Sequence, residues 1–110
     1  MILDNTSIQK QYQKYLIKLS SDLDLINILI KKDNRIYESN FTLEDLHNHK
    51  LLMSSLTTQE IIEFIIGLID INKIEIKEEN MCLKLILIST LPNHSNFVLN
   101  LQKKIKYQMK

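Results

Sequence analysis

The 110-residue sequence lacks alanine and tryptophan, and it contains one valine and one each of glycine, proline, cysteine and arginine. With Gly67 as its single glycine, the chain cannot form a glycine-rich phosphate-binding loop or the G-x-S-x-G turn of hydrolases. A single cysteine, Cys82, excludes an internal disulfide framework and is typical of a reducing compartment. These absences exclude the common nucleotide-binding motifs, the nucleophile elbow and a disulfide-stapled scaffold.

The residues that are abundant indicate one folded domain. Hydrophobic residues make up 45% of the chain and charged residues 25%, with a formal net charge of +1. That balance is typical of a globular protein with no strong overall field for nucleic acid or for basic partners. The aliphatic residues are 18 isoleucines, 18 leucines and one valine, and lysine and asparagine are common, which fits an AT-rich genome.

The first residues and the hydrophobic runs bear on location. Met1–Asn5 lacks the basic and apolar regions of a secretory signal. No apolar run approaches the roughly 18 residues that a membrane span needs. Together with the single cysteine, these features predict a cytoplasmic protein.

Two blocks of period-two alternation, 12–41 and 74–101, flank a segment with helical periodicity. Within that segment, Thr42 with Asp45 and Thr57 with Glu60 have the spacing of helix N-terminal caps. The order predicts an α+β fold: an antiparallel β-sandwich or barrel of about six to seven strands, with a helix-turn-helix inserted between the strand blocks. Its predicted divisions are a polar lead-in at 1–11, a single head-like domain at 12–103 and a tail at 104–110.

Finer features of the two blocks follow from turn chemistry. Polar clusters predict a turn at 20–22 and hairpins at 32–34 and 78–80, because Asp and Asn tolerate turn conformations. The segment 81–88 is apolar on both faces and predicts a strand inside the sheet. The first helix is expected to end near Met53.

The histidines and the cysteine are the first candidates for metal or nucleophilic chemistry. On a helix, His47 and His49 point about 200° apart and cannot share one ion. His94 lies in a distant turn, and Cys82 has no second cysteine near it, as zinc sites usually have. Solvated histidines and a small buried cysteine are the simpler interpretation, so we expect no metal and no cofactor.

The carboxylates and basic residues are equally weak evidence for a site. Glu44, Asp45, Glu60 and Glu63 are explained by helix capping and helix solvation, whereas a catalytic pair needs surroundings that split the two pKa values. Nucleic-acid binding requires a basic stripe interleaved with aromatics. The densest basic cluster contains two acidic residues as well, and its basic and aromatic members are Lys31, Lys32, Arg35 and Tyr37. We therefore predict no catalytic residues and no enzyme activity.

The turn at 89–94 contains a leucine beside the only proline. Leu91 either folds back onto the core of its own domain or projects as an anchor into a partner, as interface hot spots do. Pro92 and His94 flank it. These three residues are the candidate protein-interface site.

The succession of elements resembles the head domain shared by the scaffold proteins of non-homologous end joining (XLF, PAXX and the DNA-ligase cofactor) and the centriolar cartwheel protein. That head is an antiparallel sandwich with a helix-turn-helix between strands, followed by a coiled coil. The likeness covers about 12–103, and its segments are Ile26–Ile30, Asn40–Leu46, Ile74–Glu79, Leu83–Leu85 and Phe97–Leu101.

The resemblance implies a non-catalytic interaction and oligomerisation module, the N-terminal head of a longer coiled-coil scaffold. In the cartwheel relatives, an apolar residue at the tip of the late hairpin inserts into a second head, and the matching residue here is Leu91. Val98, Leu101 and Ile105 have the spacing of a heptad start, but the segment after them is too short to dimerise stably. The alternative is an end-joining accessory scaffold with weak nucleic-acid contact. Expected partners are proteins, including a second copy in a head-to-head dimer, at a centrosomal or cytoskeletal location, or in the nucleus for the alternative.

Overall fold

The computed structural model describes residues 6–22, 24–47, 57–89 and 95–104. Along the chain, four strands are followed by two helices and then by three strands. The elements are β1 (Thr6–Tyr12), β2 (Tyr15–Asp22), β3 (Leu25–Lys32), β4 (Arg35–Thr42), α1 (Leu43–His47), α2 (Thr58–Asp70), β5 (Ile74–Glu78), β6 (Cys82–Leu87) and β7 (Phe97–Lys104).

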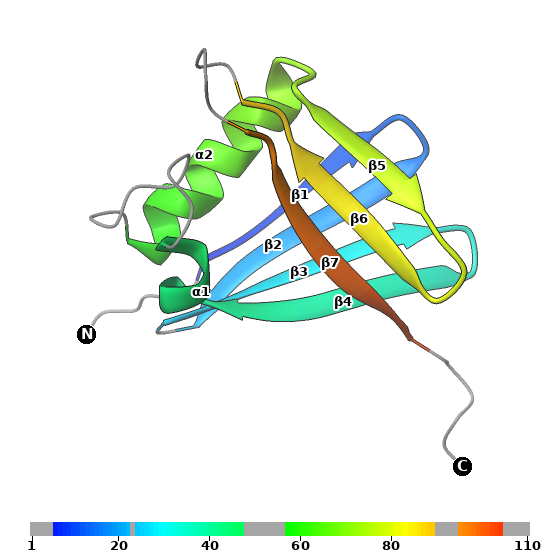
Figure 1. The fold of residues 1–110 in the computed structure, drawn as a ribbon, viewed down its shortest axis with the longest axis horizontal. Coiled ribbons are helices and arrows are strands. Elements are labelled where there is room, and N and C mark those ends of the chain that lie inside the picture. The colour runs from blue at the N-terminus through cyan, green and yellow to red at the C-terminus, as the bar shows by residue number, and fades with distance from the viewer. Residues whose placement is uncertain (1–5, 23, 48–56, 90–94, 105–110) are drawn as a thin grey trace.

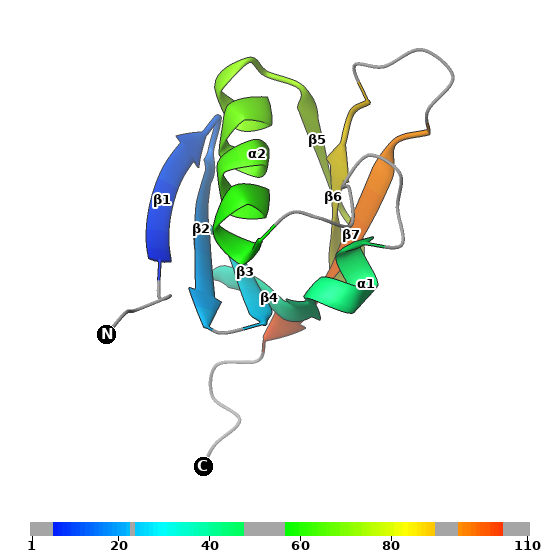
Figure 2. The same cartoon turned by 90° about the vertical axis from the view of Figure 1, so that its left-hand side faces the viewer.

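The seven strands form one antiparallel sheet in the order β1-β2-β3-β4-β7-β6-β5. The sheet curls into a half-barrel, with α2 on its concave side between β1–β3 and β5–β7 (Figures 1 and 2). The prediction of an α+β fold with about seven antiparallel strands is confirmed. The prediction left open whether the strands form a sandwich or a barrel. The described residues form a single curled sheet.

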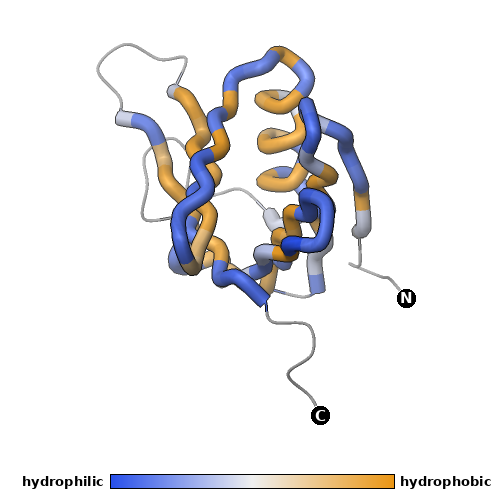
Figure 3. Tube along the Cα trace, turned by 90° about the vertical axis from the view of Figure 1, so that its right-hand side faces the viewer, coloured by the Kyte–Doolittle hydropathy of each residue, from blue (hydrophilic) through white to orange (hydrophobic). Residues whose placement is uncertain are grey.

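Alternation along the strands turns one apolar face of the sheet toward a common core, which α2 joins through its contacts with β1, β2 and β3. Ile17, Ile28, Leu85 and Leu101 are fully buried on this concave face. Hydrophobic segments accordingly lie on α2 and on the strands to either side of it (Figure 3). On the convex face, Ile86 of β6 is also buried, at 9% exposed, as the prediction of a strand apolar on both faces requires.

Both predicted helix caps are present. Thr57 accepts a hydrogen bond from the backbone N–H of Glu60 at 3.1 Å, and the Glu60 carboxylate accepts from the Thr57 N–H at 2.9 Å. Thr42 accepts from the Asp45 N–H at 3.0 Å in the same way. These bonds satisfy N–H groups that the first turn leaves without helical partners. The connection between the helices, 48–56, and the predicted helix end at Met53 lie outside the described residues.

The inward face of α2 fixes how it sits in the half-barrel. Its buried isoleucines and leucine recur at helical spacing along one side of the helix. The other helix is placed by a backbone hydrogen bond. The backbone N–H of Leu43 donates to the Asp24 carbonyl at 3.1 Å, which fixes the start of α1 beside the β2–β3 turn. The buried apolar residues of α2 are Ile61, Ile62, Ile65, Leu68 and Ile69.

Three boundaries differ from the prediction. The polar lead-in contains a strand, β1, which paired with β2 needs only one apolar face, and Ile8 and Tyr12 supply it by packing against the core. The turn predicted at 20–22 lies later, because Ser21 faces the core and pairs with Ile26 within the sheet. Lys104, expected to begin the tail, pairs with Ile36 at the end of β7.

Candidate functional site

The candidate interface residues belong to the connection between β6 and β7. Leu87 and Phe97 form the last pair of this hairpin. At its base, the side-chain oxygen of Asn96 accepts a hydrogen bond from the Ser89 backbone N–H at 2.9 Å. Leu91, Pro92 and His94 lie outside the described residues. The predicted late hairpin is therefore present, and its two described ends are held together.

The hairpin connection and the end of β7 lie at opposite ends of the sheet (Figure 1). β7 runs for eight residues from Phe97 to Lys104, which at about 3.4 Å per residue separates the two by roughly 27 Å. A contact made by the hairpin would thus be remote from any chain that continues beyond β7.

A second arrangement lies at the other end of the sheet, around the carboxylate of Glu78. Lys32 and Tyr15 donate to its Oε1 at 3.0 and 3.3 Å, and Tyr37 donates to its Oε2 at 2.9 Å. The guanidinium of Arg35 is 3.4 Å from the same Oε2. One β5 carboxylate thereby joins residues of β2, β3 and β4, although β5 is at the far edge of the sheet order.

The electrostatics of this cluster follow from its burial and its cations. The Glu78 side chain is 18% exposed. Burial would raise the pKa of the Glu78 carboxyl, but the hydrogen bonds from Lys32 and Tyr37, with the charges of Lys32 and Arg35, outweigh it and the pKa is lowered. Burial, together with Glu78, raises the pKa of Tyr15 and Tyr37. Glu78 is therefore the ionised acceptor and the tyrosines are neutral donors.

The chemistry of the Glu78 cluster favours a structural clamp, which holds β5 to β2, β3 and β4, over a catalytic site. A carboxylate offers about four lone-pair positions, and four side chains already approach the two Glu78 oxygens. A general acid at neutral pH needs a raised carboxyl pKa, whereas that of Glu78 is lowered. We assign the Glu78 cluster to closure of the curled sheet.

Further side-chain contacts join the two edges of the curled sheet, between β1 and the segment that leads into β5. The Tyr12 hydroxyl donates to the Asn72 side-chain oxygen at 2.6 Å and to the Ile74 carbonyl at 3.2 Å. Lys10 pairs with Asp70 at 2.8 Å. Side chains from the first strand block therefore hold the edge of the second without backbone pairing between β1 and β5.

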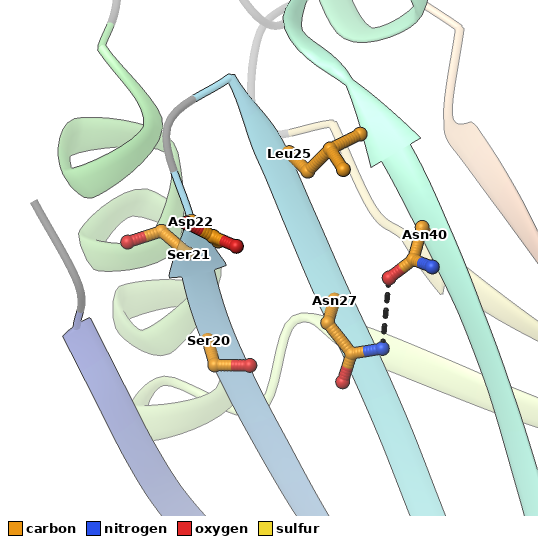
Figure 4. Close-up of a pocket in the computed structure, with 6 residues that line it drawn as sticks. All are labelled: Ser20, Ser21, Asp22, Leu25, Asn27 and Asn40. Carbon is orange, nitrogen blue, oxygen red and sulfur yellow. Dashed lines mark hydrogen bonds between the residues drawn. The ribbon is translucent and has the colours of Figure 1, made fainter.

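A pocket of about 240 Å³ opens at the other end of β2 and β3 (Figure 4). Asn27 donates to Asn40 at 2.9 Å and to Glu38 at 2.8 Å. Since both Nδ2 protons of Asn27 are used, the group it has left is the acceptor Oδ1. The pocket is lined by Ser20, Ser21, Asp22, Leu25, Asn27 and Asn40.

The residues first considered for chemistry do not converge in the described part of the chain. Cys82 is half-buried at the start of β6, not buried as predicted, and its Sγ lies 3.5 Å from the Glu79 carboxylate. Burial and Glu79 raise the pKa of the Cys82 thiol, which disfavours the thiolate. Glu60 acts as a cap, and Glu63 accepts from Gln59 at 3.3 Å.

Among the described residues, no group of three or more metal-ligating side chains is close enough to hold an ion. His49 and His94 lie outside those residues, and of His47 only the backbone is described. Nor does the described part contain a helix of the length and apolar character that a membrane crossing requires.

Sequence reasoning missed the Glu78 cluster and the pocket. Glu78 was assigned to a hairpin turn, where a carboxylate needs no partner. Its partners are 41 to 63 residues away in the chain, and no local pattern brings them together. Apart from Ser21, which faces the core, the pocket residues of β2 and β3 lie on the convex face and alternate with core residues. The available signal was therefore a largely polar convex face, which is also the ordinary face of a half-exposed strand.

Comparison with known proteins gives no family assignment. A scan of protein-family models, a search of curated proteins and a search of solved structures each found no match.

Proposed function

We propose that this chain is a non-catalytic protein-interaction and oligomerisation module that self-associates through the β6–β7 hairpin. In this proposal it is the N-terminal head of a longer coiled-coil scaffold of the centriolar cartwheel type. Its partners are proteins, including a second copy, it uses no cofactor, and it acts in the cytoplasm at a centrosomal or cytoskeletal assembly.

One observation carries the proposal: the closed base of the late hairpin, at the end of the sheet opposite the end of β7. Because β6 and β7 hold both ends of this connection in place, presenting an apolar residue from it to a partner costs less conformational freedom than presenting one from a connection with unpaired ends. A scaffold head also needs its contact remote from the chain that continues into a stalk. The hairpin meets both requirements.

The order of the elements supports the same proposal. Four strands, two helices and three strands follow one another as in the resembled head. In the proposal, α1 and α2 are the two helices of an inserted helix-turn-helix, and the two strand blocks correspond to the layers of the sandwich. Leu91 is the anchor that enters the partner, Pro92 stiffens the tip, and His94 lies at its edge.

The test is sedimentation equilibrium of the wild type beside Leu91→Glu. A carboxylate in an apolar contact pays a large desolvation cost, and central anchors contribute about 2 kcal/mol or more, so we expect dimerisation weakened about 30-fold or more. Met81→Glu is the matched control. Met81 is 56% exposed in the β5–β6 connection, so the same change of charge there is expected to leave dimerisation unaltered.

Equal effects of the two substitutions would mean that added negative charge, and not the hairpin, controls association. Unchanged dimerisation of Leu91→Glu, with its circular dichroism spectrum intact, would remove Leu91 as the anchor.

A second candidate function is nucleic-acid contact in an end-joining accessory scaffold. The observation that favours it is a set of cations at the end of the sheet that carries the β1–β2 and β3–β4 turns: Lys14, Lys31, Arg35 and Lys104. If these residues contact phosphates, fluorescence anisotropy with a short DNA duplex will give binding that falls steeply between about 50 and 200 mM salt, since each neutralised phosphate releases counterions. Absence of binding at 50 mM salt would contradict this candidate.

A further inference from the structure

Three hydrogen-bond acceptors line the pocket at the β2–β3 end of the sheet. The Asp22 carboxylate, the Asn27 Oδ1 and the Ser20 hydroxyl line it, while Leu25, at 40% exposed, gives it one apolar wall. Its volume of about 240 Å³ is below the roughly 300–1,000 Å³ of sites for drug-sized ligands. It suits the end of one long side chain, an apolar stem with a cationic head.

The surroundings of the pocket are acidic. Glu38 is bonded to the pocket residue Asn27. The bond from the Leu43 N–H to the Asp24 carbonyl brings the first turn of α1, with its two carboxylates, to the β2–β3 turn. On the neighbouring convex surface, Lys18 lies in the middle of β2, two residues before Ser20 of the pocket, and is paired with Leu29 of β3. Apart from this lysine, the charged residues named from β2, the β2–β3 turn, β4 and α1 near the pocket are acidic: Asp22, Asp24, Glu38, Glu44 and Asp45.

The opposite end of the same sheet has more cations than carboxylates, the carboxylates there being Asp33, Glu78 and Glu79. Lys14 is at the two-residue turn between the paired residues Tyr12 and Tyr15, so it projects from the tip of that hairpin. Lys31 and Lys104 are exposed at the same end, one on each side of Ile36 in the sheet. Unlike Lys32 and Arg35, which pair with Glu78, these three lysines form no ion pair within the described ranges.

The two ends are therefore complementary in charge on one rigid sheet. β3 spans eight residues from one end to the other, a distance of about 27 Å. The pocket of one molecule can therefore face the basic end of another, although not of itself. Such a contact joins different surfaces of two identical chains and repeats along a row unless it closes into a ring.

We propose that the Ser20–Asp22–Asn27 pocket receives the Lys14 ammonium of a second copy of this chain, in a head-to-tail contact separate from the β6–β7 hairpin. The inference rests on the proposed function in taking self-association as the role of the chain. It adds a second surface, whose strength depends on salt, and that surface would extend hairpin-linked pairs into longer assemblies.

The test uses Leu91→Glu as the background, so that the hairpin contact is removed. In sedimentation equilibrium at about 50 mM salt, this variant is expected still to associate, with masses that rise beyond two chains, and to become monomeric at about 500 mM salt. Adding Asp22→Lys or Lys14→Glu is expected to weaken association about tenfold or more, because each places like charges opposite one another. The matched control is Glu75→Lys, which makes the same change of charge as Asp22→Lys at an exposed residue of β5.

Mixing the Asp22→Lys and Lys14→Glu chains gives the decisive arm. Each variant alone places like charges opposite one another at the contact. In the mixture, the pocket of either variant can meet an opposite charge on the other variant, so association is expected to return. A mixture that stays monomeric, or a Glu75→Lys effect as large as that of Asp22→Lys, would overturn the proposal. If Leu91→Glu alone abolishes all association, this contact is wrong and the hairpin proposal stands. If association depends on Asp22 but not on Leu91, the pocket stands and the hairpin anchor is wrong.

Discussion

Ile65→Ala is expected to lower the free energy of unfolding by about 3–4 kcal/mol, the largest effect of any single change considered for this chain. Ile65 is fully buried at the middle of α2, on the face that fills the concave side of the sheet. The substitution removes three carbons and leaves a cavity between rigid strands. Urea unfolding followed by circular dichroism measures the change.

The matched control is Ile71→Ala. Ile71 follows α2 immediately and is 58% exposed, so the same deletion of three carbons is expected to cost less than about 1 kcal/mol, because exposed sites lose little on truncation. A similar loss at both positions would contradict the assignment of α2 as the central element of the core.

Glu78→Gln is expected to destabilise the fold by about 2 kcal/mol, because it leaves Lys32 and Arg35 without their counter-charge and both tyrosine hydroxyls without an ionised acceptor. Glu79→Gln is the control at the next position. Glu79 is 47% exposed, forms an ion pair with Lys84 at 3.4 Å and accepts a weak hydrogen bond from the Cys82 thiol at 3.5 Å, so its loss is expected to cost less than about 1 kcal/mol.

The pH dependence gives a second reading of the same cluster. The folded-state pKa of Glu78 is lowered, so its contribution is fully present above the unfolded value of about 4.3 and is lost as the pH falls through the lower folded value. The difference in stability between wild type and Glu78→Gln should therefore shrink below about pH 4. A difference that stays constant down to pH 2 would contradict the clamp.

Local chemistry made part of this fold predictable. Both helix starts follow from Thr and acidic residues at capping spacing, and both caps are formed. The β3–β4 turn follows from Asp33, which adopts φ 56° there. Asp is one of the residues that tolerate this left-handed region. In each case the signal and the structure that it specifies lie within four residues.

Other parts were beyond sequence reasoning because they depend on distant partners. β1 has few apolar residues and is recognisable only once β2 and α2 are beside it, where Lys10 meets Asp70. The Glu78 cluster forms only when the sheet has curled far enough to bring β5 to β2, β3 and β4. Leu91, Pro92 and His94 stay predictions of function that rest on the hairpin that carries them.

Sedimentation equilibrium of the unmodified chain at about 500 mM salt, from micromolar to millimolar concentration, tests the central claim most directly. The salt screens the pocket contact and leaves an apolar hairpin contact in place. We expect a weight-average mass that rises from 13.0 kDa toward that of two chains and no further. A mass of one chain at every concentration would contradict self-association through the β6–β7 hairpin.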